Sequence, residues 1–139
     1  MKDKIAAFIS KQTCGNLAAT DEQGSLWCFS FFYSFDETDF LLHYKSSFDT
    51  RHSAIIGRNP VVAGTVLPDK FNPLQIKGIQ FSGKVLSFDD PLAEKAAAHY
   101  HHKHPVALAM PGEIWTIRLD YIKFTDNTLG FGKKLIWER

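Results

Sequence analysis

Apolar and polar residues alternate with a period of two along much of this chain, a pattern typical of β-strands. The clearest case is residues 26–35, where the odd positions are all aromatic and the even positions are mostly small. Because alternate residues of a strand point to opposite faces, we expect the aromatic face to lie in the core and the small face to let another molecule approach the backbone. Further strands are predicted at residues 16–20, 40–45, 61–67, 75–88, 113–124 and 129–137.

Three short segments depart from this alternation and predict helices. Residues 3–12 carry apolar side chains at helical spacing. A second helix is expected after the cap-type residues of 46–50, and it should end at Gly57. A third is expected to begin at Asp90, which is followed by a proline suited to a first helical turn, and to run to about His104.

About seven strands and three short helices, joined mostly by hairpin-length connections, predict a mainly β fold. An antiparallel barrel with helical insertions fits this order best. The chain of 139 residues has the length of one domain, so residues 1–139 are expected to form a single unit.

Charge and composition exclude several classes of protein. Sixteen basic and fifteen acidic residues give a net charge of +1, which argues against a nucleic-acid-binding protein. No apolar run approaches the length of a membrane span. Cys14 and Cys28 lack C-x-x-C spacing and follow no signal peptide, so we expect free thiols in a reducing, cytoplasmic compartment.

A hydroxyl-rich stretch at residues 46–52 lies where a predicted strand leads into a helix. It contains Ser46, Ser47, Thr50, Arg51 and His52. Free backbone N–H groups and the helix dipole favour an anion at such a place, and an arginine can bind a phosphate or carboxylate through two hydrogen bonds. The competing interpretation is an ordinary capped helix with a solvated arginine.

A second motif resembles a nucleotide-binding loop but does not support one. Residues 78–84 match G-x-x-x-x-G-K, but Val85 follows where a nucleotide-binding loop needs a hydroxyl, and the segment alternates like a strand. We reject a nucleoside triphosphate site there and expect Gly78 and Gly83 to mark bulges or close backbone approaches. Acyl-transfer and metalloprotease motifs are absent.

Four histidines are crowded into the end of the third predicted helix. His99 with His102, and His101 with His104, are spaced to share a helix face, and such a pair could ligate zinc or a haem iron. The four do not share one face and no cysteine lies near. A solvated helix end is therefore the preferred interpretation, and no metal site is predicted.

The order of these parts resembles the pyridoxamine 5′-phosphate oxidase-like family of FMN-binding split barrels. The similarity is carried by the run 16–20, the turn at Gly24, the aromatic strand, the stretch to Arg51, and the segment Asn59-Pro60-Val61-Val62. Residues 80–85 also resemble a strand of that family. The resemblance covers most of residues 13–90 and is strongest to a subgroup of small domains.

The resemblance implies an antiparallel split β-barrel that forms a homodimer, with FMN bound at the interface between the two copies. The flavin phosphate would be held by Ser46, Thr50, Arg51 and His52. The ring system would lie along Cys28, Phe29, Ser30 and Phe31, with Gln80 as a further contact. Two departures from the family are His52 in place of the usual lysine and Ser25-Leu26 after the turn glycine.

The implied function is that of a flavin oxidoreductase that passes electrons from a reduced nicotinamide to a small acceptor. Oxidation of pyridoxamine phosphate is not expected, because the chain lacks the extended C-terminal substrate-binding segment of those enzymes. Two alternatives stay open: a non-enzymatic flavin- or haem-binding carrier or sensor, and a cofactor-free split-barrel dimer. Tyr33, Tyr44 and His52 could move protons, but no catalytic residue is assigned.

Overall fold

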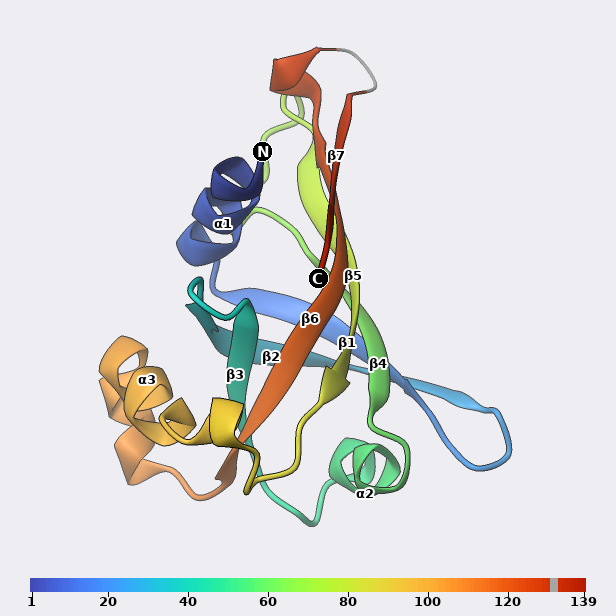
Figure 1. Ribbon diagram of the computed structural model, residues 1–139, viewed down its shortest axis with the longest axis vertical. Coiled ribbons are helices and arrows are strands. Elements are labelled where there is room, and N and C mark those ends of the chain that lie inside the picture. The colour runs from blue at the N-terminus through green and yellow to red at the C-terminus, as the bar shows by residue number, and fades with distance from the viewer. Residues whose placement is uncertain (131–132) are drawn as a thin grey trace.

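The computed structural model describes residues 1–130 and 133–139. Within them, seven strands form one antiparallel sheet in the order β3-β2-β1-β4-β5-β6-β7. An additional β3–β6 pairing closes the first six strands into a barrel, and β7 lies outside it against β6 (Figure 1). The predicted fold class, an antiparallel split β-barrel with seven strands and three helices, is confirmed.

The strands follow the predicted segments closely. They are β1 (Cys14–Thr20), β2 (Leu26–Asp36), β3 (Leu41–Ser46), β4 (Val61–Val66), β5 (Lys77–Val85), β6 (Glu113–Asp126) and β7 (Lys134–Glu138). β5 is shorter than predicted at both ends. The last strand begins later than predicted, because Asp126 caps a 3₁₀ turn at Asn127–Leu129. Residues 131–132 of the predicted strand lie outside the described residues.

The helices are α1 (Lys2–Lys11), α2 (Arg51–Arg58) and α3 (Ala96–Lys103). Gly57 does not end α2 as predicted but lies inside it, and the helix ends where Asn59, which precedes a proline, turns extended. The predicted third helix is divided, since a 3₁₀ turn capped by Asp90 precedes α3. No helix among the described residues is long and apolar enough to cross a membrane.

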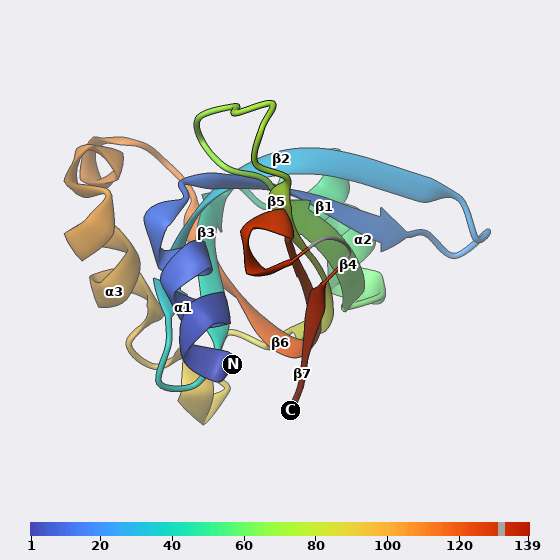
Figure 2. The same ribbon diagram turned by 90° about the horizontal axis from the view of Figure 1, so that it is seen from above.

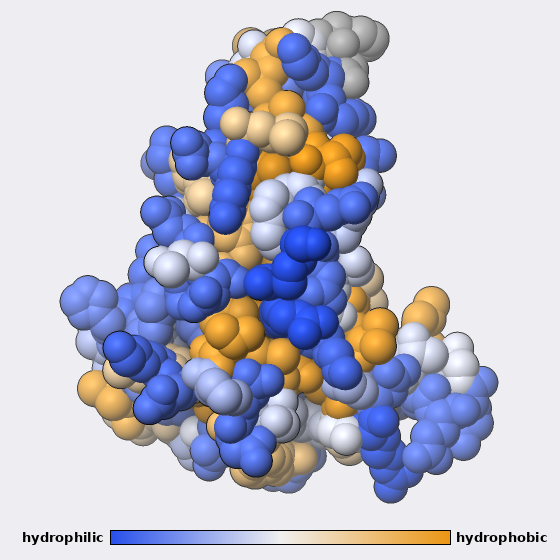
Figure 3. Space-filling model, viewed as in Figure 1, coloured by the Kyte–Doolittle hydropathy of each residue, from blue (hydrophilic) through white to orange (hydrophobic). Residues whose placement is uncertain are grey.

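The core fills the barrel between α1 and the inner faces of the strands. Ile5 and Ile9 of α1 are fully buried, and the Phe8 ring lies 5.2 Å from that of Phe124. Large apolar side chains also reach the surface, and hydrophobic groups are visible between hydrophilic ones in Figure 3. The interior is therefore packed with side chains, and ligand sites must lie on the sheet faces or at the barrel ends.

The aromatic face of β2 is only partly buried, which corrects the prediction that all of it is core. Phe31 and Tyr33 are buried, but Trp27 remains 38% exposed. The physical reason is that the β1–β2 hairpin reaches past the barrel, as Figures 1 and 2 show. The aromatic side chains near the hairpin turn therefore have no core beneath them.

β5 carries the bulge that its glycines predict. Its register against β6 shifts between Ser82 and Gly83, and a Cβ at Gly83 would collide with the backbone carbonyl of Arg118. A Cβ at Gly78 would also lie close, 3.2 Å from the Val66 carbonyl oxygen. The segment is a strand interior, as the rejection of a nucleotide-binding loop requires.

Gly83→Ala should therefore lower the free energy of unfolding by about 1–3 kcal/mol, the usual cost of forcing a side chain into a packed site. Gly57→Ala is the matched control. Apart from its own helix, no atom that the structure describes lies within 4 Å of a Cβ at Gly57, so an alanine in this helix should raise stability by about 0.5–1 kcal/mol. Urea denaturation measures both. Equal effects of the two changes would contradict the close approach of β5 to β6.

Candidate functional site

The turn that joins β3 to α2 is held by a compact set of hydroxyl groups. Thr50 is the N-cap of α2, and its Oγ1 accepts a hydrogen bond from the Ser53 amide at 3.1 Å. Ser53 Oγ donates to the Ser47 carbonyl at 2.7 Å and closes the turn. Trp115 of β6 donates from Nε1 to the Ser46 carbonyl at 2.9 Å. The first turn of α2 is thereby fixed at the end of the barrel.

His52 lies between a hydroxyl of β3 and an aromatic ring of β2. Its Nε2 is 2.7 Å from Ser46 Oγ, and its ring stacks on Phe29 with centroids 3.7 Å apart and planes 8° apart. Burial lowers the pKa of His52, so the imidazole is mainly neutral at pH 7. It therefore contributes hydrogen bonding and stacking here rather than fixed charge.

Arg51 provides the positive charge at the same place. Its guanidinium lies 4.0 Å from the centroid of the Trp27 ring, and it forms no ion pair or side-chain hydrogen bond with any residue that the structure describes. The amides of Arg51 and His52 precede the first bond inside the helix, from Ala54 N to the Thr50 carbonyl. Free N–H donors and a free cation at one helix end suit an anion.

On the opposite face of the sheet, small side chains leave a shallow hollow of about 340 Å³. Beneath it, Gly64 lets the Phe81 ring pack directly on the sheet, because a Cβ there would collide with that ring. Ser30 donates from Oγ to Asn16 Oδ1 at 2.9 Å on the same face. The hollow is lined by Asn16, Ala18, Cys28, Ala63, Gly64, Thr65, Gln80 and Phe81.

β2 connects these two faces, and much of it is an open edge. Leu26–Phe32 pair with β1, whereas only Tyr33–Asp36 pair with β3. In the described part of the chain, the other side of Leu26–Phe32 has no partner strand, so alternate backbone N–H and C=O groups point away from the sheet. A ligand along this edge would have the start of α2 on one face and the hollow on the other.

The residues predicted to bind a cofactor are divided between the two faces. Around the first turn of α2 lie Phe29, Ser46, Thr50, Arg51 and His52. On the outer face lie Cys28, Ser30 and Gln80. The Phe31 side chain is in the core and only 4% exposed, so a ligand could reach this residue through its backbone alone.

Trp27 and Asn16 belong to the site but are not found by sequence reasoning. Trp27 lies on the aromatic face, which predicts burial, yet it forms a platform for Arg51. The sequence signal that could indicate its exposure is its nearness to the hairpin turn, since the end of a strand can extend beyond the core. Asn16 has no signal in the sequence, because its neighbour Ser30 is placed by the β1–β2 register.

The two tyrosines considered as proton donors are buried. Tyr33 donates its hydroxyl to the Ile9 carbonyl at 2.7 Å, and the Tyr44 hydroxyl has no partner within the described residues. Burial raises the pKa of both phenols, and each side chain is only 1% exposed. Neither can contact a surface ligand in this arrangement, so both act as packing groups.

The histidines of α3 separate into two pairs, as their spacing predicts. His101 donates from Nδ1 to the Ala97 carbonyl at 2.8 Å and accepts from Lys45 Nζ at 3.1 Å, so its proton lies on Nδ1. His104 donates from Nε2 to the Tyr33 carbonyl at 2.7 Å. This pair fastens α3 to the barrel. The prediction of a solvated helix end is therefore wrong for these two residues.

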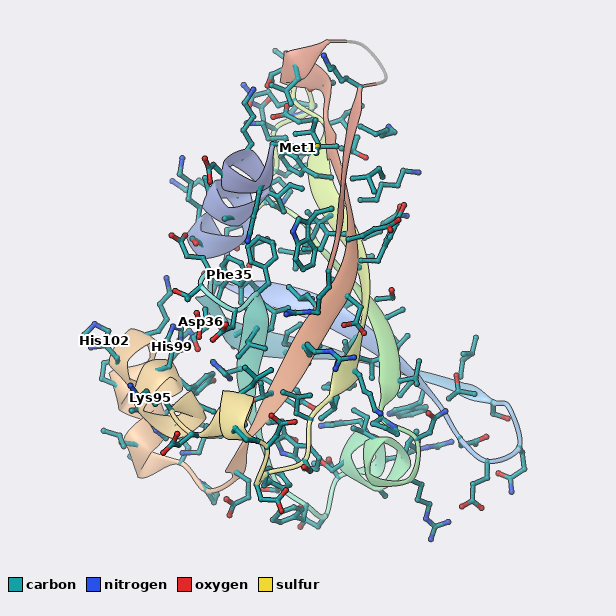
Figure 4. The ribbon with its side chains drawn as sticks, in the orientation of Figure 1. Met1, Phe35, Asp36, Lys95, His99 and His102 are labelled. Atoms are coloured by element: carbon teal, nitrogen blue, oxygen red, sulfur yellow. The ribbon has the colours of Figure 1, made fainter. Side chains whose placement is uncertain are left out.

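His99 and His102 line a separate pocket of about 330 Å³ between α3 and the end of β2 (Figure 4). His99 Nδ1 lies 2.9 Å from Ser34 Oγ, while His102 is exposed, as predicted for a helix end. Below them His43 is buried beside Thr116, with Nδ1 2.9 Å from Oγ1. Among residues 1–130 and 133–139, no group of three His, Cys, Asp or Glu side chains is placed to hold a metal ion.

Comparison with known sequences identifies close relatives. The chain is 39% identical to a UPF0306 protein of Cronobacter sakazakii over 137 residues, which cover 99% of this chain and 94% of the relative. It is 42% identical to UPF0306 protein YhbP of Shigella boydii over 135 residues, which cover 97% of this chain and 91% of the relative. No protein-family model matches the chain.

Comparison with solved structures shows the same fold at low sequence identity. A heme-binding protein from Mycobacterium smegmatis matches with a TM-score of 0.81 and 13% identity, covering 99% of this chain and 57% of that one. An FAD-binding protein from Mesorhizobium loti matches with a TM-score of 0.69 and 16% identity, over 88% and 92%. The heme storage protein HutZ from Vibrio cholerae matches with a TM-score of 0.62 and 17% identity, over 84% and 87%.

His43 should make stability depend on pH. Burial, with His99 beside it, lowers the pKa of His43 from 6.5 to about 4. As the pH falls, the unfolded chain binds the proton before the folded one does. The free energy of unfolding therefore keeps its full contribution from neutral His43 above about pH 6.5 and loses up to about 3 kcal/mol of it toward pH 4. His43→Asn keeps a polar group beside Thr116 without titrating. The stability advantage of the unmodified protein over this variant, measured by urea denaturation, should shrink from pH 7 to pH 4. A difference that does not change with pH would contradict the buried neutral state.

Proposed function

The chain belongs to the UPF0306 family, and we propose that it is a flavin-binding protein that holds FMN along the open edge of β2, with the phosphate at the start of α2. One observation carries the proposal. The free edge of Leu26–Phe32 runs beside the first turn of α2, where helix amide donors lie next to the Arg51 guanidinium, which has no ion-pair partner among the described residues. An anionic tail and a flat hydrogen-bonding ring are thus accommodated side by side.

The phosphate end is supported by the geometry of the first turn of α2. The Arg51 side chain and the Arg51 and His52 amides supply donors, and the Thr50 cap holds the turn in place. Neutral His52 adds a ring nitrogen near Ser46 rather than the charge that a lysine would bring. We therefore expect FMN to bind through one strong cationic contact.

The ring end is supported by the backbone of β2 and by the small residues beside it. Unpaired N–H and C=O groups of an edge strand can bond to the polar edge of a flavin. Cys28 and Ser30 have no bulk that would block a ring on the outer face, and Gln80 offers an amide across the hollow. The side chain of Trp27 provides an aromatic surface at the end nearest Arg51.

Bound flavin would supply the electron-transfer chemistry, as cofactors generally do, while the protein contributes binding and orientation. In this proposal the protein is an oxidoreductase that passes electrons from a reduced nicotinamide to a small acceptor. Tyr33 and Tyr44 are buried and cannot serve as acid or base, and the proposal gives His52 a binding role only. This fits hydride chemistry, which needs no proton transfer from the protein at the reacting ring atom.

We also propose that two copies pair through the outer face of β1, β2 and β4. Three large apolar side chains are exposed on this face: Leu26 is 76% exposed, and Phe32 and Val61 are each 61% exposed. The hollow, which small residues line, lies between these apolar side chains, over β1, so the flat surface of a second copy could pack closely there. Pairing there would cover the apolar groups and enclose the ring end of the cofactor site.

Haem is the second candidate cofactor, and the pocket beside α3 is the observation that favours it. His99 Nε2 and the ring nitrogens of His102 have no hydrogen-bond partner within the described residues, so either side chain could ligate iron. The pocket has a volume of about 330 Å³, and the rings of Tyr33 and Phe35 line it together with polar residues of α1 and α3. It offers an iron ligand, whereas the start of α2 and the open edge of β2 offer donors for both a phosphate and a flat polar ring, so FMN is preferred.

Arg51→Ala should weaken FMN binding by about 10- to 100-fold, because hydrogen bonds to charged groups contribute roughly 1.5–3 kcal/mol. Riboflavin lacks the phosphate, so its affinity should barely change. Arg58→Ala is the matched control: it removes the same charge from the other end of α2, where the residue pairs with Glu22. Fluorescence titration with both ligands measures these effects. An equal loss of FMN and riboflavin affinity would assign Arg51 a structural role.

Sedimentation velocity should show a dimer at micromolar concentration. Phe32→Glu and Val61→Glu place carboxylates in the proposed interface at residues that are exposed in one copy, so each variant should fold, become monomeric and bind FMN more weakly. Val106→Glu, which alters a residue 80% exposed beyond α3, should stay dimeric. A monomeric unmodified protein would overturn the shared-site proposal.

A further inference from the structure

A second hollow, of about 640 Å³, lies at the other end of the barrel from α2. It is bounded by α1, by the segment 68–75 and by the start of β5 and the end of β6. Figure 2 looks down on this end of the molecule, where α1 and the 68–75 segment lie near the turn after β6. The hollow shares no lining residue with the proposed flavin site.

Lysines surround this hollow. Lys4, Lys11, Lys70 and Lys77 all line it, although the net charge of the whole chain is only +1. Lys77 lies 3.9 Å from Asp126 Oδ2, and the other three form no ion pair within the described residues. Hydrophilic side chains cover most of the surface over α1 in Figure 3. The hollow therefore has a local excess of positive charge.

The two acidic residues of the hollow are occupied by structural hydrogen bonds. Asp69 accepts from the Thr13 amide at 3.0 Å and from Thr13 Oγ1 at 2.7 Å. Asp126 Oδ1 accepts from the Thr128 amide at 2.9 Å, and the Thr128 hydroxyl also donates to it. These carboxylates hold the 68–75 segment and the turn after β6 in place. Lys4, Lys11 and Lys70 line the hollow and form no ion pair with any residue that the structure describes.

The floor of the hollow is partly apolar. Ala7, Pro68 and Leu129 line it, above the buried rings of Phe8 and Phe124, whose centroids are 5.2 Å apart. A small inorganic anion would leave this surface bare. A ligand with a flat apolar body would cover it, and its charged groups would meet the lysines at the rim.

We propose that this hollow binds an organic polyanion that joins phosphate groups to a flat ring, the chemistry of a nucleoside polyphosphate. The lysines come from α1, the 68–75 segment and β5, so they are spread around the rim and suit several negative charges rather than one carboxylate. Lysine binds phosphate as a point charge and does not require one fixed geometry. The site is independent of the flavin proposal, since it uses none of the same residues.

Isothermal titration with ATP tests the proposal, with inorganic tripolyphosphate as the probe that lacks a ring. We expect ATP to bind one site per chain at micromolar to sub-millimolar concentration, and affinity to fall as salt rises. Tripolyphosphate should bind at least fivefold more weakly, because it has no ring to cover the apolar floor at Ala7, Pro68 and Leu129. Equal affinity of the two probes would overturn the role of this floor.

Two variants locate the site. The double variant Lys4→Gln, Lys70→Gln should lose at least tenfold in ATP affinity, and Lys84→Gln, which removes a charge from an exposed residue of β5 that does not line the hollow, should lose less than twofold. Lys4, Lys70 and Lys84 are all exposed, so the variants should fold. Arg51→Ala should leave ATP binding unchanged. A larger effect of Arg51→Ala than of the double variant, equal effects of all the lysine changes, or no saturation at millimolar ATP would each overturn the proposal.

Discussion

The divided pairing of β2 is the constraint on which the rest of this structure depends. The strand pairs with β1 along its first part and with β3 along its last part. Its first part, next to the β1–β2 hairpin, therefore extends beyond the closed barrel. Had β3 continued beside it, every backbone group would be paired and the two faces would be separated by a closed sheet. Because β3 instead ends at Ser46 and leads into α2, an open edge and a helix N-terminus lie together. The candidate cofactor site is a direct consequence of this arrangement.

The same arrangement explains why the site residues have such different environments. Phe29 and His52 stack where the strand still faces α2, whereas Cys28 and Ser30 look outward over the hollow. One strand thus supplies an aromatic support on one face and open space on the other, with free backbone groups between. A ligand that has a charged end and a flat ring matches the order of these surfaces, from the start of α2 across the open edge to the hollow. This match is the physical basis for preferring a flavin over a porphyrin. The lysine-lined hollow at the other barrel end has a different origin, in the packing of α1 against β6.

Much of the fold follows from local patterns, while the site does so only in part. Alternation predicts most of the strands and the Thr50 cap predicts where α2 begins, because each of these depends on neighbouring residues alone. Gly83 predicts a bulge or close approach in β5, but its partner, the Arg118 carbonyl of β6, is set by the pairing of the two strands. Alternation also assigns each residue of β2 to a face, but it does not reveal where the strand passes the end of the core, and so it places Trp27 inside. Long-range partners are equally hidden: His101 is held by Lys45 and His104 by the Tyr33 carbonyl, and both partners come from strands distant in sequence.

Binding of flavin at the open edge of β2 would be visible in the absorption spectrum of the protein. The freshly purified protein would be mixed with FMN, passed through gel filtration and measured, and a second sample would be treated with haemin in the same way. Flavin bands should elute with the protein and should be lost in the Arg51→Ala variant. A protein that elutes without flavin, or that takes up haemin instead with a Soret band abolished by His99→Ala or His102→Ala, would contradict flavin binding at this edge.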